Sequence, residues 1–505
     1  MYNFDSLTLK YFVSENNDFI NGAIVQKIQL PSRYEVILNI RNLKKAQNKK
    51  LYININPQYP HVCFINDKTQ YLRNIEIPQK PPMFCMQLRK YLNGSKIKDF
   101  RQVEYDRILE FYFDYVDEIG SIKTICLACE FMGKYSNIVL YEQKSKSIIG
   151  AAHNVSSDKS SIRELYGGIK YIYPPLKNKL NVLNISFATF SKYTNIDDIS
   201  NNFYYLNKAL LDDIFQKNNL NFEFLQNLVS LNNPQYICDF WGGDNINNSI
   251  DNYFSNIINR NLIKSKKAKL NKTVQSKIKK LEKLVCDMPD DKKALEYKNK
   301  ADFIMCNLYT PENIDFKIDN KISLSENAQK YYKLYKKSIN AHNYMLAKIN
   351  KAKEQLRYFD EILFSIENSS DFIELDEIES ELGIGSKKSI NTPKITKIEY
   401  KGWDIYVGKN NKQNDYLISK IARSEDLWFH GLNYPSGHII LKVPNNKKEP
   451  SKEIIEYCAK LTKENSKARN GGKASVIMTK RKNLKKPPDT YLGYVTYKNE
   501  TEIVI

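Results

Sequence analysis

Two apolar seams with helical spacing lie in the middle of this 505-residue chain, and they restrict its possible folds more than any other feature. From about residue 262 to 364, apolar residues recur at steps of three and four, which is the spacing of a coiled-coil seam. At 1.5 Å per residue, arms over 262–308 and 325–364 would each be roughly 60–70 Å long, too long for a compact domain. We therefore expect a projecting antiparallel coiled-coil hairpin rather than a helical core packed on its neighbours.

Both arms have identifiable seam positions. The polar members His342 and Lys353 would help to fix the register of the second arm. We expect Ser325 to cap that arm, Pro289 to kink the first arm and Pro311 to precede an extended connection. The seam residues are Leu270, Val274, Ile278, Leu281, Val285 and Met288 in the first arm, and Tyr332, Tyr335, Ile339, His342, Leu346, Ile349, Lys353 and Leu356 in the second.

The segments on either side predict an α+β multidomain protein. In the first 175 residues, Asp5 is placed to cap a helix, and Gly94 to end another in PPMFCMQLRKYLNG. Alternation in segment 34–41 puts Val36, Leu38 and Ile40 on one face of a strand. Further strands are expected in 23–30, 51–55, 106–115 and 136–142, and a proline pair at 174–175 marks the end of the domain.

The remaining segments differ in composition. Residues 176–260 are rich in asparagine and helical in period, and predict several short helices. Residues 366–390 are acidic, and we expect a helix there that is closed by Gly383 and packs on a basic neighbour. From about residue 394 a strand pattern returns, with a helix near 452–468 and a basic loop, TKRKNLKKPP, close to the end.

The charge balance favours a polyanionic partner. Lysine and arginine total 77 against 57 acidic residues, so the net charge is +20, which favours nucleic acid over a lipid surface. The chain is also crowded with asparagine, isoleucine and tyrosine, as AT-rich coding tends to produce, so we give this bulk charge half of its usual weight. No secretory leader, run of 18 apolar residues or disulfide spacing of the cysteines is visible in the sequence, which predicts a cytoplasmic protein without a membrane partner.

No segment has the pattern of an enzyme active site. The sequence contains no phosphate-binding loop, dinucleotide fingerprint or nucleophile elbow, so we expect no catalysis and no cofactor. The lone pair Cys126 and Cys129 predicts buried thiols rather than a zinc or redox site. His430 and His438 lie eight residues apart across a turn without further ligands, so structural or RNA-contact roles are favoured over a metal site.

Asp106 and Arg107 open a strand pattern and need a separate explanation. Alternation directs Asp106 toward the face of Ile108 and Arg107 toward the apolar face of Leu109 and Phe111. An arginine at the start of an apolar strand face either forms an ion pair with an acidic residue or has a function at the end of the sheet. The residues alone favour a structural ion pair.

Several long motifs resemble the NFACT family. FDSL, PPMFCMQLRKYLNG, the Asp-Arg strand, EFMGKYSNIVLY and LYGGIKYIYPP occur in the order seen in the N-terminal domain of that family. SLSENAQKYYKLYKK resembles its second coiled-coil arm, and VGKNNKQNDYLISKIARSEDLWFHGLNYPSGHIILK with KPPDTYLGYVTYKNETEIVI resembles its C-terminal domain. The resemblance runs nearly from end to end. It implies an α/β NFACT-N domain (1–175), a helix-hairpin-helix domain (176–260), a coiled-coil hairpin with a short acidic helix (261–390) and an α+β NFACT-R domain (391–505).

The resemblance also implies a function. Family members bind a large ribosomal subunit that still carries peptidyl-tRNA, and recruit tRNA, here alanyl-tRNA, for template-free C-terminal tailing that marks the stalled chain for degradation. Implied partners are rRNA, a ribosomal protein at the stalk base reached by the coiled-coil tip, and a small ribosome-associated heat-shock protein. The ribosome itself would form the peptide bonds, so the chain would not be an enzyme.

The resemblance also assigns roles to individual residues, namely those that match the family's motifs. Asp5, Asp106 and Arg107 match its tRNA-critical residues, which reverses the preference for a structural ion pair. Two departures exist: Lys134 replaces the usual arginine after Gly133, and 435–438 reads Pro-Ser-Gly-His where the family usually has Pro-Gly-Ser-His. Possible RNA contacts are Arg89, Lys134, Asn137, Asp426, Trp428, His430, His438, Lys480 and Arg481.

Two other hypotheses were weighed. The N-terminal domain resembles formamidopyrimidine-DNA glycosylases, but Tyr2 and Asn3 stand where those enzymes have a proline nucleophile and a glutamate. A fibronectin-binding surface adhesin lacks an export signal and a wall-anchoring feature in this sequence. It is kept as the alternative function, together with a nucleic-acid-binding scaffold without elongation activity.

Overall fold

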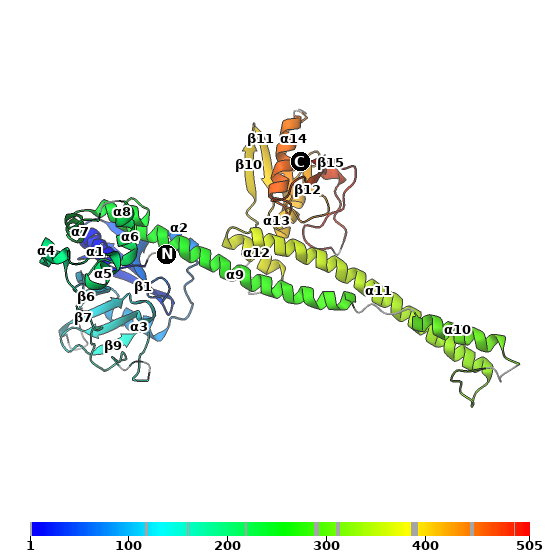
Figure 1. The fold of residues 1–505 in the computed structure, drawn as a ribbon, viewed down its shortest axis with the longest axis horizontal. Helices are drawn as coiled ribbons and strands as arrows, with labels where there is room; N and C mark the ends of the chain where they lie inside the picture. Colours follow the sequence, from blue (N-terminus) through cyan, green and yellow to red (C-terminus); the bar gives the residue numbers. More distant parts are fainter. Residues whose placement is uncertain are drawn as a thin grey trace. The chain divides into compact units, whose positions relative to one another are not determined.

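The computed structural model describes residues 3–116, 120–158, 160, 162–217, 220–286, 292–309, 314–384, 392–444, 449–488 and 490–505. The chain divides into two compact units, Met1–Leu262 and Ile263–Ile505, and each is described by itself (Figure 1). Expectations about Met288, Pro289 and Pro311 lie outside the described residues.

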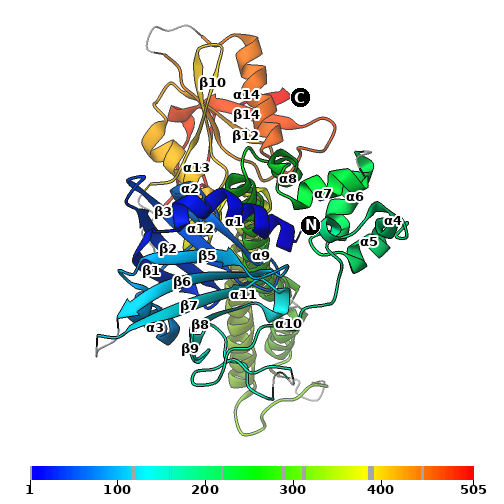
Figure 2. The ribbon, with the colours of Figure 1, turned by 90° about the vertical axis from the view of Figure 1, so that its left-hand side faces the viewer.

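Two antiparallel sheets form the centre of the first unit, and α1 runs along their strands (Figure 2). The ring of Phe12 on α1 packs against Phe64 of one sheet and Phe100 of the other, at centroid distances of 6.4 and 6.3 Å. One sheet consists of β1 (Ile24–Ser32), β2 (Glu35–Asn42), β3 (Gln47–Asn54) and β4 (His61–Ile65) in that order, and the other of β5 (Ile97–Gln102), β6 (Ile108–Val116), β7 (Ile122–Glu130), β8 (Asn137–Glu142) and β9 (Ile148–Ala151). The helices are α1 (Ser6–Ile20), α2 (Asp67–Leu72) and α3 (Met83–Leu92).

Several local predictions for this unit are confirmed. Asp5 is the N-cap of α1, and Gly94, with φ of +81°, follows α3 in the left-handed conformation that favours glycine. Val36, Leu38 and Ile40 are buried as expected, although Ile37 on the other face is buried too. β4, β5, β7 and β9 were not expected from the sequence.

Asparagine starts most of the short helices between residues 187 and 241. Asn195, Asn207, Asn221 and Asn233 are the N-caps of successive helices, and each side chain accepts a hydrogen bond from a backbone N–H in the first turn. The asparagine-rich composition of this segment therefore has a structural use. The helices are α4 (Phe187–Phe190), α5 (Ile196–Asn202), α6 (Lys208–Gln216), α7 (Phe222–Val229) and α8 (Pro234–Trp241).

These helices share one hydrophobic core with the two sheets. Tyr11 of α1 donates to the carbonyl oxygen of Leu228 at 2.6 Å, and Trp241 Nε1 donates to Thr8 Oγ1 at 3.1 Å. The predicted division at residue 175 and the helix-hairpin-helix arrangement stay predictions.

The long helix α9 (Ile246–Cys286) begins well before residue 262, where the first arm was predicted to start. The helix thus begins before the predicted arm, although residue 262 is where the two compact units divide. Polar groups of the first unit hold the first turns of the helix. Glu15 accepts hydrogen bonds from the backbone N–H groups of Ile246 and Asn247, at 2.8 and 3.1 Å. Arg73, fully buried, forms an ion pair with Asp251 at 2.7 Å.

In the second unit the rest of α9 packs against α11 (Leu324–Asn368), and α10 (Lys292–Cys306) also packs on α11. The predicted seam residues Leu270, Val274 and Ile278 are buried against Ile362 and Ile366. Whether these helices form a coiled-coil hairpin stays a prediction.

Two predictions about α11 are wrong. Its N-cap is Ser323, not Ser325, because Ser323 and Glu326 form a reciprocal capping box. Lys353 is exposed, and Ala352 is buried in its place, so the seam does not follow the strict alternation of steps.

The acidic segment forms α12 (Phe372–Glu381), and Gly383, with φ of +67°, follows it as predicted. Its predicted basic neighbours are confirmed: Lys266 pairs with Glu379 at 3.0 Å and Lys409 with Glu374 at 3.0 Å.

The last part of the chain is a six-stranded antiparallel sheet in the order β10-β11-β13-β12-β14-β15, with α14 packed on it. The predicted strands and helix are present, whereas β12 and β15 were not expected. The elements are β10 (Thr396–Tyr400), β11 (Trp403–Val407), α13 (Asn411–Tyr416), β12 (Leu427–Gly431), β13 (Ile439–Leu441), α14 (Lys452–Glu464), β14 (Ser475–Lys480) and β15 (Thr501–Val504).

Candidate nucleic-acid interface

The three residues matched to tRNA contact lie together in one pocket of the first unit. Asp5, Asp106 and Arg107 line a cavity of about 770 Å³. Its walls come from the start of α1, the β5–β6 turn and two segments near residues 174–179 and 200–212. The pocket thus joins residues that lie up to 200 positions apart in the chain.

Asp5 links two helices at the pocket. Its Oδ1 accepts the backbone N–H of Thr8 at 2.7 Å, and its Oδ2 accepts a hydrogen bond from the side chain of Asn207, the N-cap of α6. Burial raises the pKa of Asp5, while the Thr8 hydrogen bonds and the positive charge of Arg107 act in the opposite direction. The carboxylate therefore has a structural role, and it also faces the arginine.

The backbone beside Arg107 is held on both sides. Asp106 Oδ1 accepts the backbone N–H of Arg107 at 2.8 Å, and the Arg107 carbonyl accepts from Phe131 at 2.9 Å. Gln102 Nε2 bonds the carbonyl oxygens of both Asp106 and Ser6, at 2.7 and 2.9 Å, and so joins this turn to α1.

The Arg107 guanidinium, in contrast, forms no hydrogen bond or ion pair with any other described residue. The structural ion pair that the residues alone favoured is therefore not formed as a direct contact among the described residues, although the charge of Arg107 acts on Asp5. A guanidinium without a hydrogen-bond partner in the protein can donate two hydrogen bonds to a phosphate or stack on a base.

An aromatic wall beside Arg107 was missed from the sequence. The ring of Tyr105 stacks on Tyr204 at 4.4 Å and meets Tyr205 edge-on at 5.7 Å. Glu104 and Tyr205 both have left-handed backbones, with φ of +46° and +69°, and Tyr205 donates to the Glu104 carbonyl at 3.1 Å. Strained non-glycine residues of this kind cluster at functional sites. The adjacent tyrosines at 204–205 have no periodic pattern that would have identified them.

Three other predicted contacts in this unit lie outside the pocket lining. Arg89 on α3 donates from Nε to the Ile28 carbonyl at 3.0 Å, and Lys134 is exposed beside the ring of Tyr135. Asn137 is 2% exposed, and its amide bonds the backbone of His153 in both directions. Asn137 therefore supports the fold, and its contact with RNA stays a prediction.

Three of the predicted residues at the C-terminal sheet pack against one another. Trp428 stacks on His430, and His438 meets both rings edge-on, with centroid distances between 5.1 and 5.5 Å. Burial lowers the pKa of His430 to about 4 and that of His438 well below its usual range. Both imidazoles are therefore neutral at pH 7 and offer no charge to a phosphate.

Asp426 is likewise structural. It is 1% exposed, and its carboxylate bonds Lys442 Nζ at 2.5 Å and the backbone N–H groups of Arg423 and Val443. Asp426, Trp428 and His438 are thus buried and support the fold of the sheet, and their contact with RNA stays a prediction.

The departure at 435–438 also has a local reason. A Cβ at Gly437 would lie 2.2 Å from the carbonyl oxygen of Gly408, so only glycine fits there. Ser436 Oγ accepts the backbone N–H of Gly431 at 2.8 Å, which ties this turn to β12.

The basic loop near the end is partly neutralised. Lys480 and Lys482 both pair with Glu425, at 2.9 and 2.8 Å, and Arg481 Nε donates to the Ile418 carbonyl at 2.9 Å. These side chains reach the surface, but much of their charge is already compensated.

Cys126 and Cys129 are both fully buried in β7, as predicted. Within the described ranges, no group of three or more histidine, cysteine, aspartate or glutamate side chains could hold a metal ion. In the same part of the chain, no helix has the length and apolarity needed to cross a membrane.

A positioned arginine beside stacked tyrosines, in a strongly basic chain, is typical of proteins that bind unpaired RNA. Comparison with known families gives the same class. The model described as "NFACT N-terminal and middle domains" matches residues 5–219 and 214–397, and the "NFACT protein RNA binding domain" matches 396–499. The chain belongs to the NFACT family.

Similar relatives extend over nearly the whole chain. The "Rqc2 homolog RqcH" of Streptococcus suis is 29% identical over 548 residues, covering 98% of this chain and 97% of the relative. The protein of the same name from Bacillus subtilis is 26% identical over 576 residues, covering 99% and 97%. A solved N-terminal part of the Streptococcus suis fibronectin/fibrinogen-binding protein is 29% identical, with a TM-score of 0.40, and covers 45% of this chain and 85% of that one. Family membership and the RNA-binding domain support a role in ribosome quality control.

Proposed function

We propose that this protein binds obstructed large ribosomal subunits carrying peptidyl-tRNA and recruits tRNA, with alanyl-tRNA as its substrate, for template-free C-terminal tailing of stalled chains. The uncommitted guanidinium of Arg107, held in a pocket with Asp5 and Asp106, is the observation that carries the proposal. Asp5 and Asp106 cannot bind phosphate, so they orient the arginine or accept from base amino groups and ribose hydroxyls of an unpaired loop. The chain acts as a binding factor, and the ribosome forms the bonds.

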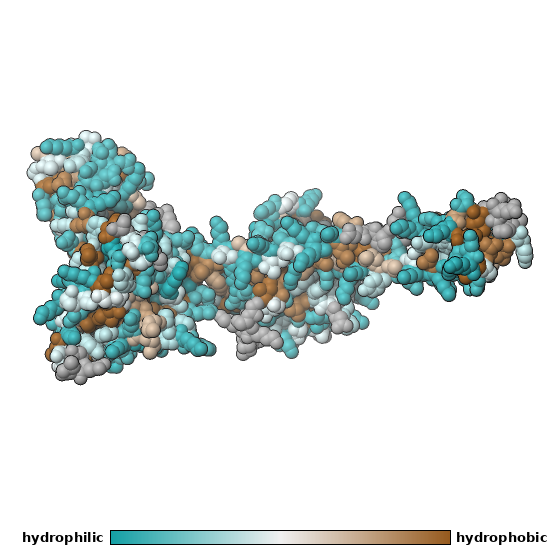
Figure 3. Space-filling view, turned by 90° about the horizontal axis from the view of Figure 1, so that it is seen from below, coloured by the Kyte–Doolittle hydropathy of each residue, from teal (hydrophilic) through white to brown (hydrophobic). Residues whose placement is uncertain are grey.

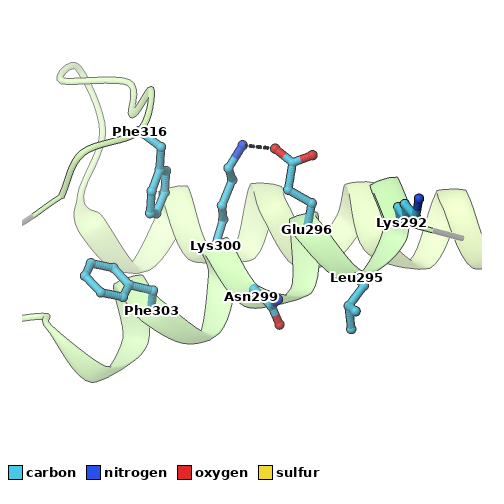
Figure 4. Close-up of a pocket in the computed structure, with 7 residues that line it drawn as sticks. All are labelled: Lys292, Leu295, Glu296, Asn299, Lys300, Phe303 and Phe316. Carbon is cyan, nitrogen blue, oxygen red and sulfur yellow. Dashed lines mark hydrogen bonds and ion pairs between the residues drawn. The ribbon is translucent and has the colours of Figure 1, made fainter.

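The far end of the long helices supports a second part of the proposal. Figure 3 shows a hydrophobic patch there, at the right of the view. In the close-up, Phe303 and Phe316 lie beside a pocket of about 420 Å³, and their rings meet edge-on at 5.9 Å (Figure 4). Leu295 is 58% exposed and Tyr309 96% exposed. Because exposed apolar clusters mark protein interaction sites, we infer that an antiparallel coiled-coil hairpin presents this tip to a ribosomal protein at the stalk base. The small ribosome-associated heat-shock protein completes the proposed assembly.

Sequencing of RNA that co-purifies with tagged full-length protein tests the pocket. Wild type should recover large-subunit rRNA with one enriched tRNA, while Arg107→Ala should lose at least tenfold of the tRNA and keep the rRNA. Arg41→Ala, an exposed arginine of the same unit, is the matched control and should behave as wild type. Mass spectrometry of stalled reporter chains then shows whether an alanine tail is added.

If neither RNA is enriched over a basic control protein, the proposal is wrong, and fibronectin binding becomes the next function to test. The tip is tested separately by co-sedimentation with large subunits. Leu295→Ser combined with Phe303→Ser should weaken it, whereas Tyr344→Ser, at an exposed position on α11, should not.

A further inference from the structure

The positive charge of this chain is concentrated in two helical segments. Residues 263–286 of α9 and 327–353 of α11 contain sixteen lysines, no arginine and one acidic residue, Glu282. These segments make up about a tenth of the chain but contribute +15 of its net charge of +20. AT-rich coding would spread lysine over the whole chain, so it does not account for this concentration.

Few of these lysines are neutralised. Lys266 and Lys269 pair with residues of α12, and Lys330 pairs with Asp319. None of the other thirteen forms an ion pair with a described residue. The basic loop of the C-terminal sheet differs, because three of its lysines have acidic partners.

The exposed lysines lie on the helix faces opposite the apolar seams. Lys272, Lys279 and Lys283 follow one another at steps of seven and four, which places them on one face of α9, away from the buried Val274 and Ile278. They extend over about 16 Å of helix axis. On α11 the exposed lysines that share one face are Lys333, Lys336, Lys337, Lys348 and Lys351.

This arrangement is unfavourable for the free protein. Lys279 and Lys283, like Lys333 and Lys337, are four residues apart on one helix, where like charges repel. A polyanion along these faces would remove the repulsion and would gain entropy from released counterions.

The residue types favour the backbone of double-stranded RNA over other polyanions. Lysine is a point charge that binds phosphate without reading bases, and the absence of arginine excludes the usual base-reading fork from these segments. Single strands need exposed aromatic platforms, yet among the described aromatic side chains of the two segments only Tyr344 is largely exposed. A lipid surface needs apolar residues on the basic face, whereas Ser265, Gln275 and Ser276 lie between these lysines.

We propose that the exposed lysines of α9 and α11 form a docking surface for the phosphate backbone of duplex RNA, without sequence preference. The inference rests on the proposed function, where such a duplex would be a helical segment of rRNA. It adds that the long helices contact RNA along their length, independently of the tRNA pocket.

Binding of the full-length protein to a 24-base-pair RNA duplex of arbitrary sequence, measured by fluorescence anisotropy at several salt concentrations, tests the surface. The variants Lys272→Gln/Lys279→Gln/Lys283→Gln and Lys333→Gln/Lys337→Gln/Lys351→Gln should each lower affinity at least tenfold at physiological salt. Each should also reduce the slope of log K against log salt by about 2–3, since each phosphate contact contributes about 0.9. Glutamine keeps the helix propensity of lysine, and circular dichroism verifies the fold.

The matched control removes the same charge from exposed ion pairs elsewhere, in Lys397→Gln/Lys401→Gln/Lys452→Gln, and should bind as wild type. Unchanged duplex binding in both lysine variants would overturn the inference. So would equal affinity of wild type for polyglutamate, single-stranded RNA or phosphatidylserine vesicles. Arg107→Ala should bind the duplex normally. Intact duplex binding without tRNA recovery from cells would therefore refute the proposed function and leave this surface standing.

Discussion

Arg107 stands in a pocket with two carboxylates and stacked tyrosines, whereas the lysines of α9 and α11 stand in rows with one acidic residue among them. In the pocket, hydrogen bonds hold the backbone from which a single arginine side chain extends. On the helices no lysine needs a fixed orientation, because the summed charge acts at a distance. The two proposals assign two different ways of binding RNA to these regions: a shaped site that selects a ligand, and an extended charged surface that supplies affinity.

The largest expected effect is on stability, and it concerns the buried ion pair between Arg73 and Asp251 in the first unit. Asp251→Ala leaves Arg73 buried without its partner, and should lower the free energy of unfolding by about 3–5 kcal/mol. Asp404→Ala removes an exposed partner of Lys397 and should cost about 0–1 kcal/mol. Urea denaturation, followed by hydrogen exchange of peptides from residues 3–262 for Asp251→Ala, measures the loss. Equal costs for the two variants would show that burial does not strengthen the dependence of Arg73 on its partner.

The second prediction concerns carboxylates where α11 and α12 pack. Burial raises the pKa of both Glu361 and Glu381 to about 7, and the negative charge of Glu381 adds to the rise at Glu361. Because the folded state holds these protons more tightly than the unfolded state, stability of the second unit should fall as pH rises from about 4.5 to 7, and then level off. Glu381→Gln should flatten this dependence, while Glu399→Gln, at an exposed position, should not. Unfolding at pH 5, 6, 7 and 8 measures it. Other titratable groups around the pair are Tyr358, Asp360, Lys412 and Asp415.

The third prediction divides the two roles of Asp5. Asp5→Ala should lose the cap of α1, at a cost of about 1 kcal/mol. Asp5→Asn should keep the cap, lose the hydrogen bond from Asn207 and remove the charge that faces Arg107, so tRNA recovery should fall well below that of Asn207→Ala, which loses the same hydrogen bond but keeps the charge. Normal tRNA recovery by Asp5→Asn would restrict Asp5 to its structural role.

The smallest effect is a gain. Without RNA, Lys279→Gln should raise the stability of the second unit by a few tenths of a kcal/mol at low salt, because it relieves repulsion from Lys283. The gain should vanish in about 1 M salt, where surface charges are screened. Thermal unfolding at both salt concentrations checks it. A gain that persists in high salt would point to helix propensity rather than charge.

Most local structure was predictable from the sequence. The cap at Asp5, the strand with Val36, Leu38 and Ile40, and the acidic helix before Gly383 all depend on residues a few positions apart. β7 and β12 were missed, since short apolar runs do not show whether they will find strand partners on both sides. The early start of α9 was missed for a similar reason: its turns before residue 262 are held by Glu15 and Arg73, which lie far away in the chain.

The sequence by itself determined which segments are helical and where the charge accumulates, because periodicity and composition are local properties. Only the tertiary structure decided that Asp5 meets Asn207 and that Tyr105 stacks on Tyr204, contacts that join residues about 100 to 200 positions apart. It also decided which charges are available: Lys480 and Lys482 share an acidic partner, whereas Lys279 has none among the described residues. Availability depends on which side chains folding brings within hydrogen-bond reach, and neighbours in sequence do not specify that.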